Sequence, residues 1–518
     1  LSRGEKVSVL GDNCPEWLYA DLATQSAGAI TVGIYPTDTA VQVKYLLNNS
    51  DSTFVVVKDQ EQTDKVLEVM NDLPLLKKII VIDMKGLRNY KEPKIISFQE
   101  VENLGMVLDE KEPGLFERMV DTTRPEDVAI LVYTSGTTGP PKGAMLSHKN
   151  ILSMMDSLFH VIPFYENDSL VSSLPLCHIA ERMFSVFFPM KSGAIINFAE
   201  SIDTLQADVR EISPTCFLQV PRIWEKIHST VTIKMQDAFC LKRWVYWITY
   251  FSLLRPLRNR LGLLETRLCV SGSAPIAPEI LKFYHALGLP IRECYAMTEM
   301  SGITFIHHGN DIKLGTVGEP LPGVEFKLAE DGEILQKSES VFEGYYKNPE
   351  ATEKIKKDGW LYTGDVGEID EDGHLKITDR KKAIIITSYG KNIAPSEIEN
   401  KLKFSPYIKE VIVIGDGKPF LTALIQIEFE NVANWAQNQR IPYTTFKSLA
   451  QHPEIYELIR REVEKVNKDL ARVETIRKFT LLDKELDRDD EELTATMKVR
   501  REMIEKKFGH LIEGMYRK

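Results

Sequence analysis

The chain has 518 residues, of which 43% are hydrophobic and 27% are charged. These proportions are ordinary for a globular protein, and they exclude a disordered, collagenous or small disulfide-rich chain. The formal net charge is −11 and there is no long basic stripe, so nucleic acid is not the expected partner. At roughly 150 residues per domain, the length predicts about three domains or subdomains.

Six cysteines lie far apart, without a C-x-x-C pair or a histidine at zinc-ligand spacing. We therefore expect reduced, buried cysteines in a cytoplasmic protein. No apolar run approaches the ~20 residues of a membrane-spanning helix, since the best candidate, 183–198, contains Lys191. No signal peptide is evident, and because the chain begins at Leu1 we expect that its N-terminus is truncated.

Short β-branched runs, separated by segments of helical length, mark the first part of the chain. They predict strands at Lys6–Leu10, Thr53–Val57, Ile79–Ile82 and Val128–Tyr133. Runs of this kind are typical of buried parallel strands in an α/β domain. The fourth strand leads directly into a loop rich in glycine, threonine and serine.

The residue pattern changes in the middle of the chain. Ala277–Gly288 is predicted as a helix, because Pro278 suits a first turn and Gly288 suits a helix stop. From about 302 to 372, glycine and proline turns separate short strands, which predicts a β-rich subdomain.

A charged turn at Asp379–Lys382 is predicted as a domain boundary. Beyond it we expect a helix that begins with a capping box at Ser396–Glu399. The other elements predicted there are a strand at Ala383–Thr387, strands at Val411–Ile414 and Leu421–Ile427, and an amphipathic helix at Glu457–Leu470.

The expected fold class is therefore α/β. Residues 1–380 would form a large N-terminal domain of α/β subdomains with a β-rich subdomain, and residues 381–518 a smaller α+β domain.

The strongest single signal is the loop 133–143, with the sequence YTSGTTGPPKG. Four hydroxyl side chains and three glycines surround one cation, Lys142. Glycines let backbone N–H groups approach phosphate oxygens, while hydroxyls add donors and lysine adds a point charge. It is not a Walker A loop, which needs G-K-[ST], because Gly143 and Ala144 follow the lysine. A flexible surface loop is the alternative, but the position after a buried strand favours phosphate binding.

This loop resembles the signature loop of the adenylate-forming superfamily, which includes acyl- and aryl-CoA synthetases, peptide-synthetase adenylation domains and beetle luciferases. Further segments resemble the motifs of this family, in the expected order. They are SGSAP at 271–275, YAMTE at 295–299, YTGD at 362–365, DRKK at 379–382, GKNIAP at 390–395 and LTATMK at 493–498.

The resemblance implies two half-reactions with ATP, Mg²⁺ and CoA. A carboxylate and ATP would give an acyl-adenylate and pyrophosphate, and the thiol of CoA would then displace AMP. Because two anions must meet in line, catalysis would be mainly positioning and charge neutralisation.

The resemblance also implies roles for residues of this sequence. Lys498, Thr298 and Glu299 would be catalytic, and Thr134 and Glu299 would hold Mg²⁺. The residues expected to bind ATP or AMP are Thr134, Ser135, Gly136, Thr137, Thr138, Gly139, Lys142, Ser273, Ala274, Cys294, Tyr295, Ala296, Met297, Thr298, Asp365, Arg380 and Lys498. Tyr295 would pack against adenine and Asp365 would accept the ribose hydroxyls.

The C-terminal domain would act as a moving lid. Lys382 would be the hinge, and rotation after adenylation would withdraw Lys498 and bring Gly390 and Lys391 to the CoA tunnel. From composition alone, 379–382 is an ordinary charged turn.

Two segments resemble long-chain fatty acyl-CoA synthetases in particular: LPLCHIAER at 174–182 and VPRIWEK at 220–226. The resemblance places His178, Trp224 and Gly272 at the acyl pocket, with the indole as a gate over an apolar tunnel. Burial of an alkyl chain contributes ~0.8 kcal/mol per CH₂. The alternatives are a core tryptophan and a satisfied buried histidine.

The segment 242–260 has five basic residues, several aromatic residues and no acidic ones, and Pro256 is predicted to end its helix. This pattern suits a helix in a membrane interface, on the cytosolic face, and a helix buried against the N-terminal domain is the alternative.

We thus expect a long-chain fatty acid–CoA ligase. The alternatives are an enzyme that loads an acyl carrier protein, a medium-chain or aryl acid CoA ligase, a luciferase-type oxygenase and a non-catalytic binder. Homo-oligomerisation stays open.

Overall fold

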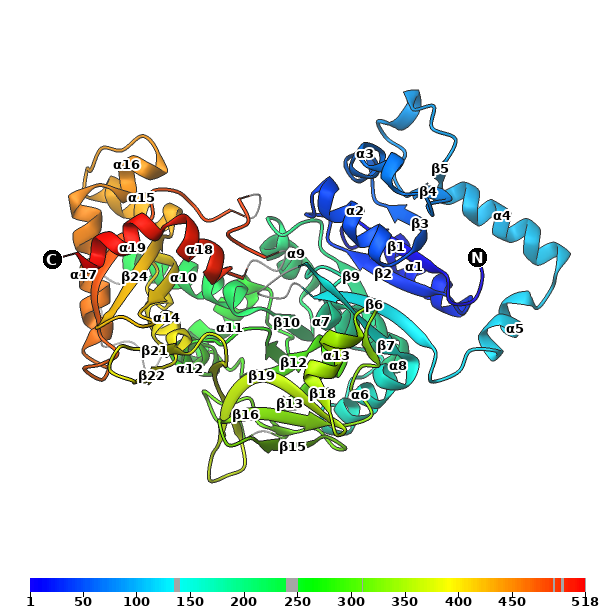
Figure 1. Ribbon diagram of the computed structural model, residues 1–518. Helices are drawn as coiled ribbons and strands as arrows, with labels where there is room; N and C mark the ends of the chain where they lie inside the picture. Colours follow the sequence, from blue (N-terminus) through cyan, green and yellow to red (C-terminus); the bar gives the residue numbers. More distant parts are fainter. Residues whose placement is uncertain (135–139, 239–249, 310, 488–489, 495–497, 518) are drawn as a thin grey trace.

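The computed structural model describes residues 1–134, 140–238, 250–309, 311–487, 490–494 and 498–517 (Figure 1). The segments between these ranges, which include Cys240 and residues 135–139 of the glycine-rich loop, lie outside the described residues. The described part contains two large sheets, a smaller antiparallel sheet and a C-terminal domain with a sheet of its own.

The first sheet has eight strands in the order β17-β7-β6-β2-β1-β3-β4-β5. Its strands are β1 (Lys6–Leu10), β2 (Ile30–Ile34), β3 (Ser52–Val57), β4 (Lys78–Val81), β5 (Ile95–Ser97), β6 (Val128–Thr134), β7 (Lys142–Ser147) and β17 (Gly344–Tyr345). β1 to β6 run parallel, whereas β7 and β17 are antiparallel to their neighbours. The predicted parallel strands of an α/β domain are confirmed here.

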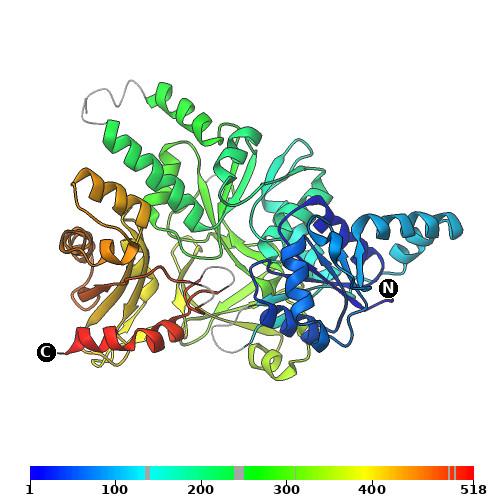
Figure 2. The same cartoon turned by 90° about the horizontal axis from the view of Figure 1, so that it is seen from above.

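The helices of this region follow the strands in alternation. They are α1 (Pro15–Ser26), α2 (Ala40–Asn49), α3 (Gln60–Glu68), α4 (Phe98–Lys111), α5 (Leu115–Asp121) and α6 (His148–Val161), with 3₁₀ turns at Met70–Asp72 and Leu87–Asn89. α4 and α5 project from the body (Figure 2) and bury none of their residues.

The second sheet has seven strands in the order β14-β13-β12-β11-β10-β8-β9. Its strands are β8 (Ser169–Ser172), β9 (Ile195–Phe198), β10 (Cys216–Gln219), β11 (Leu268–Ser271), β12 (Ile291–Met297), β13 (Gly302–Ile306) and β14 (Glu319–Pro320). β8 to β12 run parallel, and β13 and β14 extend the sheet antiparallel.

The helices around this sheet include one π-helical turn, a form that is frequent at functional sites. They are α7 (Ile179–Arg182), η3 (Met183–Phe187, the π-helical turn), α8 (Phe188–Ser192), α9 (Leu205–Ile212), α10 (Pro221–Ala238), α11 (Tyr250–Leu261), α12 (Pro278–Ala286) and the 3₁₀ turn η4 (Thr298–Met300).

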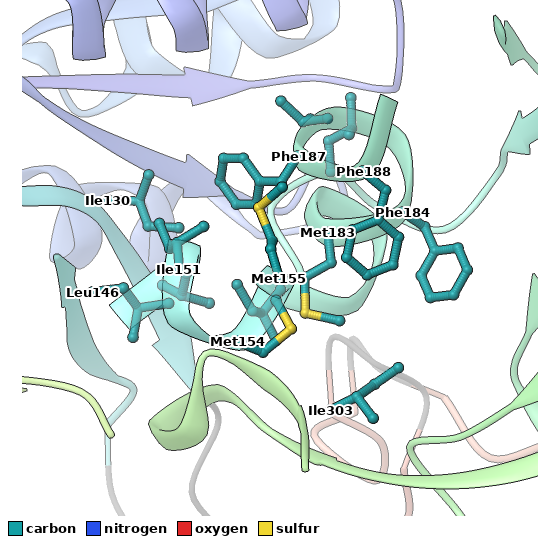
Figure 3. Packing of buried hydrophobic residues seen from close by; sticks show 14 of the residues in the cluster. Ile130, Leu146, Ile151, Met154, Met155, Met183, Phe184, Phe187, Phe188 and Ile303 are labelled. Atoms are coloured by element: carbon teal, nitrogen blue, oxygen red, sulfur yellow. The ribbon is translucent and has the colours of Figure 1, made fainter. Parts of the chain in front are cut away.

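One hydrophobic core joins the two large sheets. In it Met183, Phe184 and Phe188 of the π-helical turn and α8 pack beside Met154 and Met155 of α6 (Figure 3). Methionine fills irregular gaps between packed elements, and burial of each such side chain contributes about 1.5–3 kcal/mol. The core therefore fixes the start of the second sheet relative to the strands around the glycine-rich loop.

The third sheet confirms the β-rich subdomain predicted for 302–372. Its antiparallel strands are β15 (Glu325–Leu328), β16 (Glu333–Lys337), β18 (Lys356–Lys357), β19 (Trp360–Ile369) and β20 (Leu375–Arg380), and α13 (Pro349–Ile355) precedes β18.

The C-terminal part, residues 381–518, is called the lid below. Its strands are β21 (Ile385–Ile386), β22 (Asn392–Ile393), β23 (Ile408–Ile414), β24 (Leu421–Ile427) and β25 (Ile476–Leu481). Its helices are α14 (Pro395–Lys403), α15 (Phe429–Asn438), α16 (Phe446–Ala450), α17 (Pro453–Asn467), α18 (Arg501–Lys507) and α19 (Gly509–Tyr516). The lid has its own core and packs beside α10 (Figure 2), where the rings of His228 and Phe404 stack at 5.4 Å.

Two predictions of helix ends are wrong. Ser396 does not open a capping box, because α14 begins at Pro395 without a side-chain cap. The N–H and hydroxyl of Ser396 both donate to Asp379, at 3.0 Å each, so a carboxylate from β20 takes the place of the local cap. Pro256 does not end α11, which continues to Leu261, since a proline inside a helix can kink it without breaking it. The strand expected at 383–387 is also shorter, and only Ile385–Ile386 pair.

The described cysteines, Cys14, Cys177, Cys216, Cys269 and Cys294, are buried and free. Within the described ranges, no group of three or more His, Cys, Asp or Glu side chains is placed to hold a metal ion. None of the helices described is both long enough and apolar enough to cross a bilayer.

Candidate active site

Strand pairing fixes both ends of the glycine-rich loop. Thr134, the last residue of β6, lies opposite Lys142, the first residue of β7, and its hydroxyl is 3.5 Å from the carbonyl of Lys142. Of the seven residues between them, five lie outside the described residues: Ser135, Gly136, Thr137, Thr138 and Gly139. Lys142 therefore enters the site from a defined strand position, with its Nζ 5.2 Å from the ring centre of Tyr345.

Glu299 lies on the other side of the same tyrosine. The hydroxyl of Tyr345 donates to Oε1 of Glu299 at 2.6 Å, and the backbone N–H of Phe342 donates to the carbonyl of Glu299 at 2.9 Å. Glu299 belongs to η4, which follows β12 directly, and Thr298 begins this turn. The structure thus brings the cation of the loop and the carboxylate of the YAMTE segment to one tyrosine.

Asp365 forms a second cluster at the end of the β-rich subdomain. The hydroxyl of Tyr295 donates to its Oδ2 at 2.6 Å, and Nε of Arg380 lies 3.2 Å from its Oδ1. Asp365 is buried, whereas the side chain of Arg380 is 60% exposed, so the guanidinium faces open space beside the carboxylate. Burial, and then the neighbouring carboxylate, raises the pKa of Tyr295 well above its usual value, so the phenol stays protonated and donates.

Lys498 reaches this cluster from the lid. Its backbone N–H donates to the hydroxyl of Thr494 at 3.0 Å, in a turn closed by the bridge between Leu493 and Val499. Desolvation, and then the charge of Arg380, lowers the pKa of Lys498 to about 8, although part of the side chain is exposed. The carboxylate of Asp365 acts in the opposite direction. The structure therefore places Asp365, Arg380 and Lys498, from two domains, close enough that the first two affect the pKa of Lys498.

His178 faces the same region. Burial, and then the charge of Lys498, lowers the pKa of His178 to about 4, so the imidazole is neutral near pH 7. Its Nδ1 accepts from the N–H of Ala180 at 3.2 Å and caps α7. The ring is thus hydrogen-bonded locally, which is compatible with a satisfied buried histidine, and it is also a neighbour of Lys498.

A narrow apolar pocket opens at the carboxyl ends of the parallel strands of the second sheet, where open α/β sheets bind ligands. It is lined by Leu174, Ala180, Met183, Phe184, Leu218, Gln219, Val220, Gly272, Ser273, Cys294, Ala296 and Ile303. Gly272 allows a close approach, because a Cβ there would lie 2.6 Å from the sulfur of Cys294. Ala274, beside Ser273, is exposed.

Trp224 does not line this pocket. It is fully buried, with ring contacts to Phe217 at 5.3 Å and Tyr284 at 5.0 Å. The hydroxyl of Tyr284 donates to its carbonyl at 2.8 Å, and its indole N–H has no partner among the described residues. In this structure Trp224 is a core residue at the start of α10.

The expected CoA loop lies apart from these clusters. Gly390 and Lys391 are exposed in the hairpin between β21 and β22, where the N–H of Gly390 bonds the carbonyl of Thr387 at 2.8 Å. Among the described residues, no contact joins them to Lys142, Glu299 or Asp365. Lys382 is exposed just after β20.

Sequence reasoning missed Tyr345, although the segment that contains it, FEGYY, is visible in the sequence. It also missed the fully buried ion pair between Asp21 and Arg182, and the buried Glu181, whose pKa burial raises to about 7. These contacts join residues 46 and 161 positions apart, and periodicity carries no signal at such distances.

Comparisons with known proteins support one family. The model of the AMP-binding enzyme family matches residues 1–346, and that of the AMP-binding enzyme C-terminal domain matches residues 382–518. Long-chain-fatty-acid–CoA ligase FadD15 of Mycobacterium bovis is 34% identical, over all of this chain and 89% of its own length. Long-chain-fatty-acid–CoA ligase ACSBG2 of Xenopus laevis is 30% identical, over all of this chain and 77% of its own length.

Two solved structures share the fold. The anthranilate CoA ligase AuaEII, in complex with anthranoyl-AMP, superposes with a TM-score of 0.75 at 22% identity, over 99% of this chain and 89% of the other. The adenylation domain of a carboxylate reductase from Mycobacterium chelonae gives a TM-score of 0.78 at 22% identity, over 100% of this chain and 81% of the other.

Proposed function

The chain belongs to the AMP-binding enzyme family, and from this premise we propose that it is a long-chain fatty acid–CoA ligase. The observation that carries the proposal is the similarity, over the whole chain, to two relatives that bear this name. The apolar pocket beside the charged cluster of Asp365, Arg380 and Lys498 supports it, since a fatty acid offers one carboxylate and one alkyl chain.

The nucleotide would lie between the two clusters. Tyr295 and Arg380 orient both oxygens of Asp365, whose remaining lone pairs would accept the ribose hydroxyls. Lys142 would meet the β- and γ-phosphates together with the hydroxyls and N–H groups of the loop. Thr298 would donate to the α-phosphate.

The residues at Glu299 fit a magnesium ion. One carboxylate beside the phosphate-loop cation is a suitable protein ligand for an ion that is otherwise held by phosphate oxygens and water. Glu299 and the hydroxyl of Thr134 would hold it. When bound, Mg²⁺ neutralises charge on the phosphates.

In the first half-reaction a carboxylate oxygen forms a bond to the α-phosphorus as the bond to the bridging oxygen of pyrophosphate breaks. The ammonium of Lys498 would neutralise charge on the carboxylate and on the phosphorus oxygens in the transition state. In the second, the sulfur of CoA forms a bond to the acyl carbon, AMP leaves, and the thiol proton is released. His178, neutral and close to Lys498, would border the carboxylate end of the acyl pocket.

The domain arrangement is part of the proposal. Residues 1–380 would bind ATP and the acyl chain, and residues 381–518 would rotate about Lys382. The lid position described here, with Lys498 near Asp365, would be that of the first half-reaction.

Contact of 242–260 with a membrane surface stays a prediction, since residues 242–249 of that segment lie outside the described residues. Co-sedimentation with liposomes tests it. Replacing the aromatic residues of the segment should reduce binding, and unchanged partitioning would contradict it.

One assay tests the main proposal. The protein is incubated with ATP, Mg²⁺, CoA and palmitate, and AMP and acyl-CoA are measured. Equal amounts of AMP and acyl-CoA are expected. AMP or pyrophosphate without a thioester would contradict the ligase and favour loading of a carrier protein, whereas a thioester formed only with benzoate or octanoate would correct the substrate class.

A further inference from the structure

Tyr345 contacts two charged groups that the proposed function uses. Its hydroxyl donates to Oε1 of Glu299 at 2.6 Å, and its ring lies 5.2 Å from Nζ of Lys142. Among the described residues, the other oxygen of Glu299 accepts no hydrogen bond. A carboxylate held by one oxygen in this way presents the second oxygen in a fixed direction.

The backbone of Tyr345 is anchored to the strand that carries Lys142. β17 pairs with β7, with Tyr345 opposite Ala144, and the N–H of Tyr346 donates to the carbonyl of Gly143 at 2.8 Å. The N–H of Tyr345 also donates to the hydroxyl of Thr352 at 2.9 Å. The ring therefore cannot shift without disturbing the edge of the first sheet.

The same segment is also anchored to the turn that carries Glu299. The N–H of Phe342 donates to the carbonyl of Glu299, and the ring of Phe342 packs edge-on against Tyr345 at 5.0 Å. Tyr345 thus stands between the edge of one large sheet and the end of a strand of the other.

We propose that Tyr345 is a positioning residue that sets Glu299 for Mg²⁺ and Lys142 for the triphosphate, an inference that rests on the proposed function. The hydroxyl orients the carboxylate, and such groups behind a metal ligand typically change metal affinity 10–100-fold. The ring holds the ammonium through a cation–π contact that phosphate oxygens then replace.

The chain offers a matched control in the next residue. Tyr346 also donates its hydroxyl to a carboxylate, that of Asp51 at 2.9 Å, and its ring lies 4.8 Å from Nζ of Lys6. Tyr346 directly follows β17, and these contacts are with Asp51 and Lys6 rather than with Glu299 and Lys142, so it repeats this chemistry away from the site. Loss of a tyrosine hydroxyl from this segment can thus be separated from loss of the contact with Glu299.

The test is calorimetric titration of ATP into the full chain, with Mg²⁺ and with EDTA, without fatty acid or CoA. For Tyr345→Phe we expect ATP affinity to fall about tenfold with Mg²⁺ and less than twofold in EDTA, because only the contact with Glu299 is lost. Tyr345→Leu, which also removes the ring from Lys142, should weaken ATP in both buffers. Tyr346→Phe should change neither.

Equal losses with and without Mg²⁺ for Tyr345→Phe, or a similar loss in Tyr346→Phe, would overturn the inference. A thermal midpoint measured for each variant separates misfolding from weaker binding. The wild-type assay with palmitate tests the proposed function separately. If that assay fails, the comparison of ATP affinity between wild type and the Tyr345 variants still tests the role of Tyr345.

Discussion

Arg182 forms two hydrogen bonds with the carboxylate of Asp21, at 3.0 Å and 2.8 Å, and both side chains are fully buried. The guanidinium also lies 4.9 Å from the ring of Trp17. Asp21 belongs to α1, beside the first sheet, and Arg182 ends α7 just before the π-helical turn. One ion pair therefore joins helices from the two large sheets immediately before Met183 and Phe184, which line the apolar pocket.

Removal of one partner from this pair should destabilise the fold. Asp21→Ala leaves a buried guanidinium without its counter-charge, and such changes cost about 3–5 kcal/mol. The free energy of unfolding of the first cooperative transition in urea measures this loss. Lys77→Ala is the control, because the side chain of Lys77 is 55% exposed in its pair with Glu5, and exposed pairs contribute about 0–1 kcal/mol. Equal effects for both variants would contradict a structural role of the buried pair.

Gly272→Ala should block the apolar pocket. The added methyl group would lie 2.6 Å from the sulfur of Cys294, so the walls of the pocket must shift. We expect kcat/KM for palmitate to fall at least about tenfold while ATP affinity changes little. Gly105→Ala is the control, since nothing lies within 4 Å of a Cβ at that position. A normal palmitate profile in Gly272→Ala would show that the acyl chain binds elsewhere.

The first half-reaction should decline at alkaline pH. Because the pKa of Lys498 is lowered to about 8, its ammonium loses a proton as pH rises through that value, and kcat/KM reports the free enzyme. Pyrophosphate exchange across pH 6.5–9.5 measures this. Lys498→Arg should be slower but should lose the alkaline limb, because guanidinium stays charged.

Lys498→Ala gives a second readout of the same residue. Adenylation should fall far more than thioester formation from supplied acyl-adenylate. An equal loss in both half-reactions would remove Lys498 from its proposed role.

Glu181 should make stability depend on pH. Burial raises its pKa in the folded state to about 7, so the protonated carboxyl favours folding at low pH, and this stability is lost as pH rises from about 4.5 through 7. Glu181→Gln keeps an acceptor for the hydroxyl of Ser185 and cannot ionise. The variant should gain stability over wild type by the order of 3 kcal/mol at pH 8, with little gain at pH 4.5. A difference in stability between Glu181→Gln and wild type that is constant across pH would argue against ionisation of Glu181 as its cause.

The sequence predicts elements best where one local pattern decides them. The runs KVSVL and LTALIQI form β1 and β24 with the predicted bounds, because buried β-branched residues favour a strand over a helix. The site residues Asp365, Arg380 and Lys498 could be proposed only through resemblance to a family. From composition alone, each is an ordinary charged residue that would be exposed to solvent. The structure then brings them together from a strand pair and the lid.

The errors arise where a distant group competes with a local pattern. Ser396 has a suitable partner for a capping box in its own helix, but Asp379 of β20 offers a charged acceptor at 3.0 Å. Tyr345 looks like an ordinary strand tyrosine until β17 is paired with β7, and strand pairing across 200 residues is not visible in a local pattern. Trp224 is in a family-like segment and its ring packs against Phe217 and Tyr284, and its role as a gate over the acyl tunnel stays a prediction.

The hydrogen bonds of Asp379 bear on which substrate is used first. The carboxylate belongs to the strand before the hinge, and Ser396 belongs to the first helix of the lid. A rotation about Lys382, as proposed, would separate the two groups and return the carboxylate to water. Under the proposed rotation, these hydrogen bonds would favour the lid position in which Lys498 lies near Asp365. The order of substrates would then be a property of the equilibrium between lid positions, set before any ligand binds.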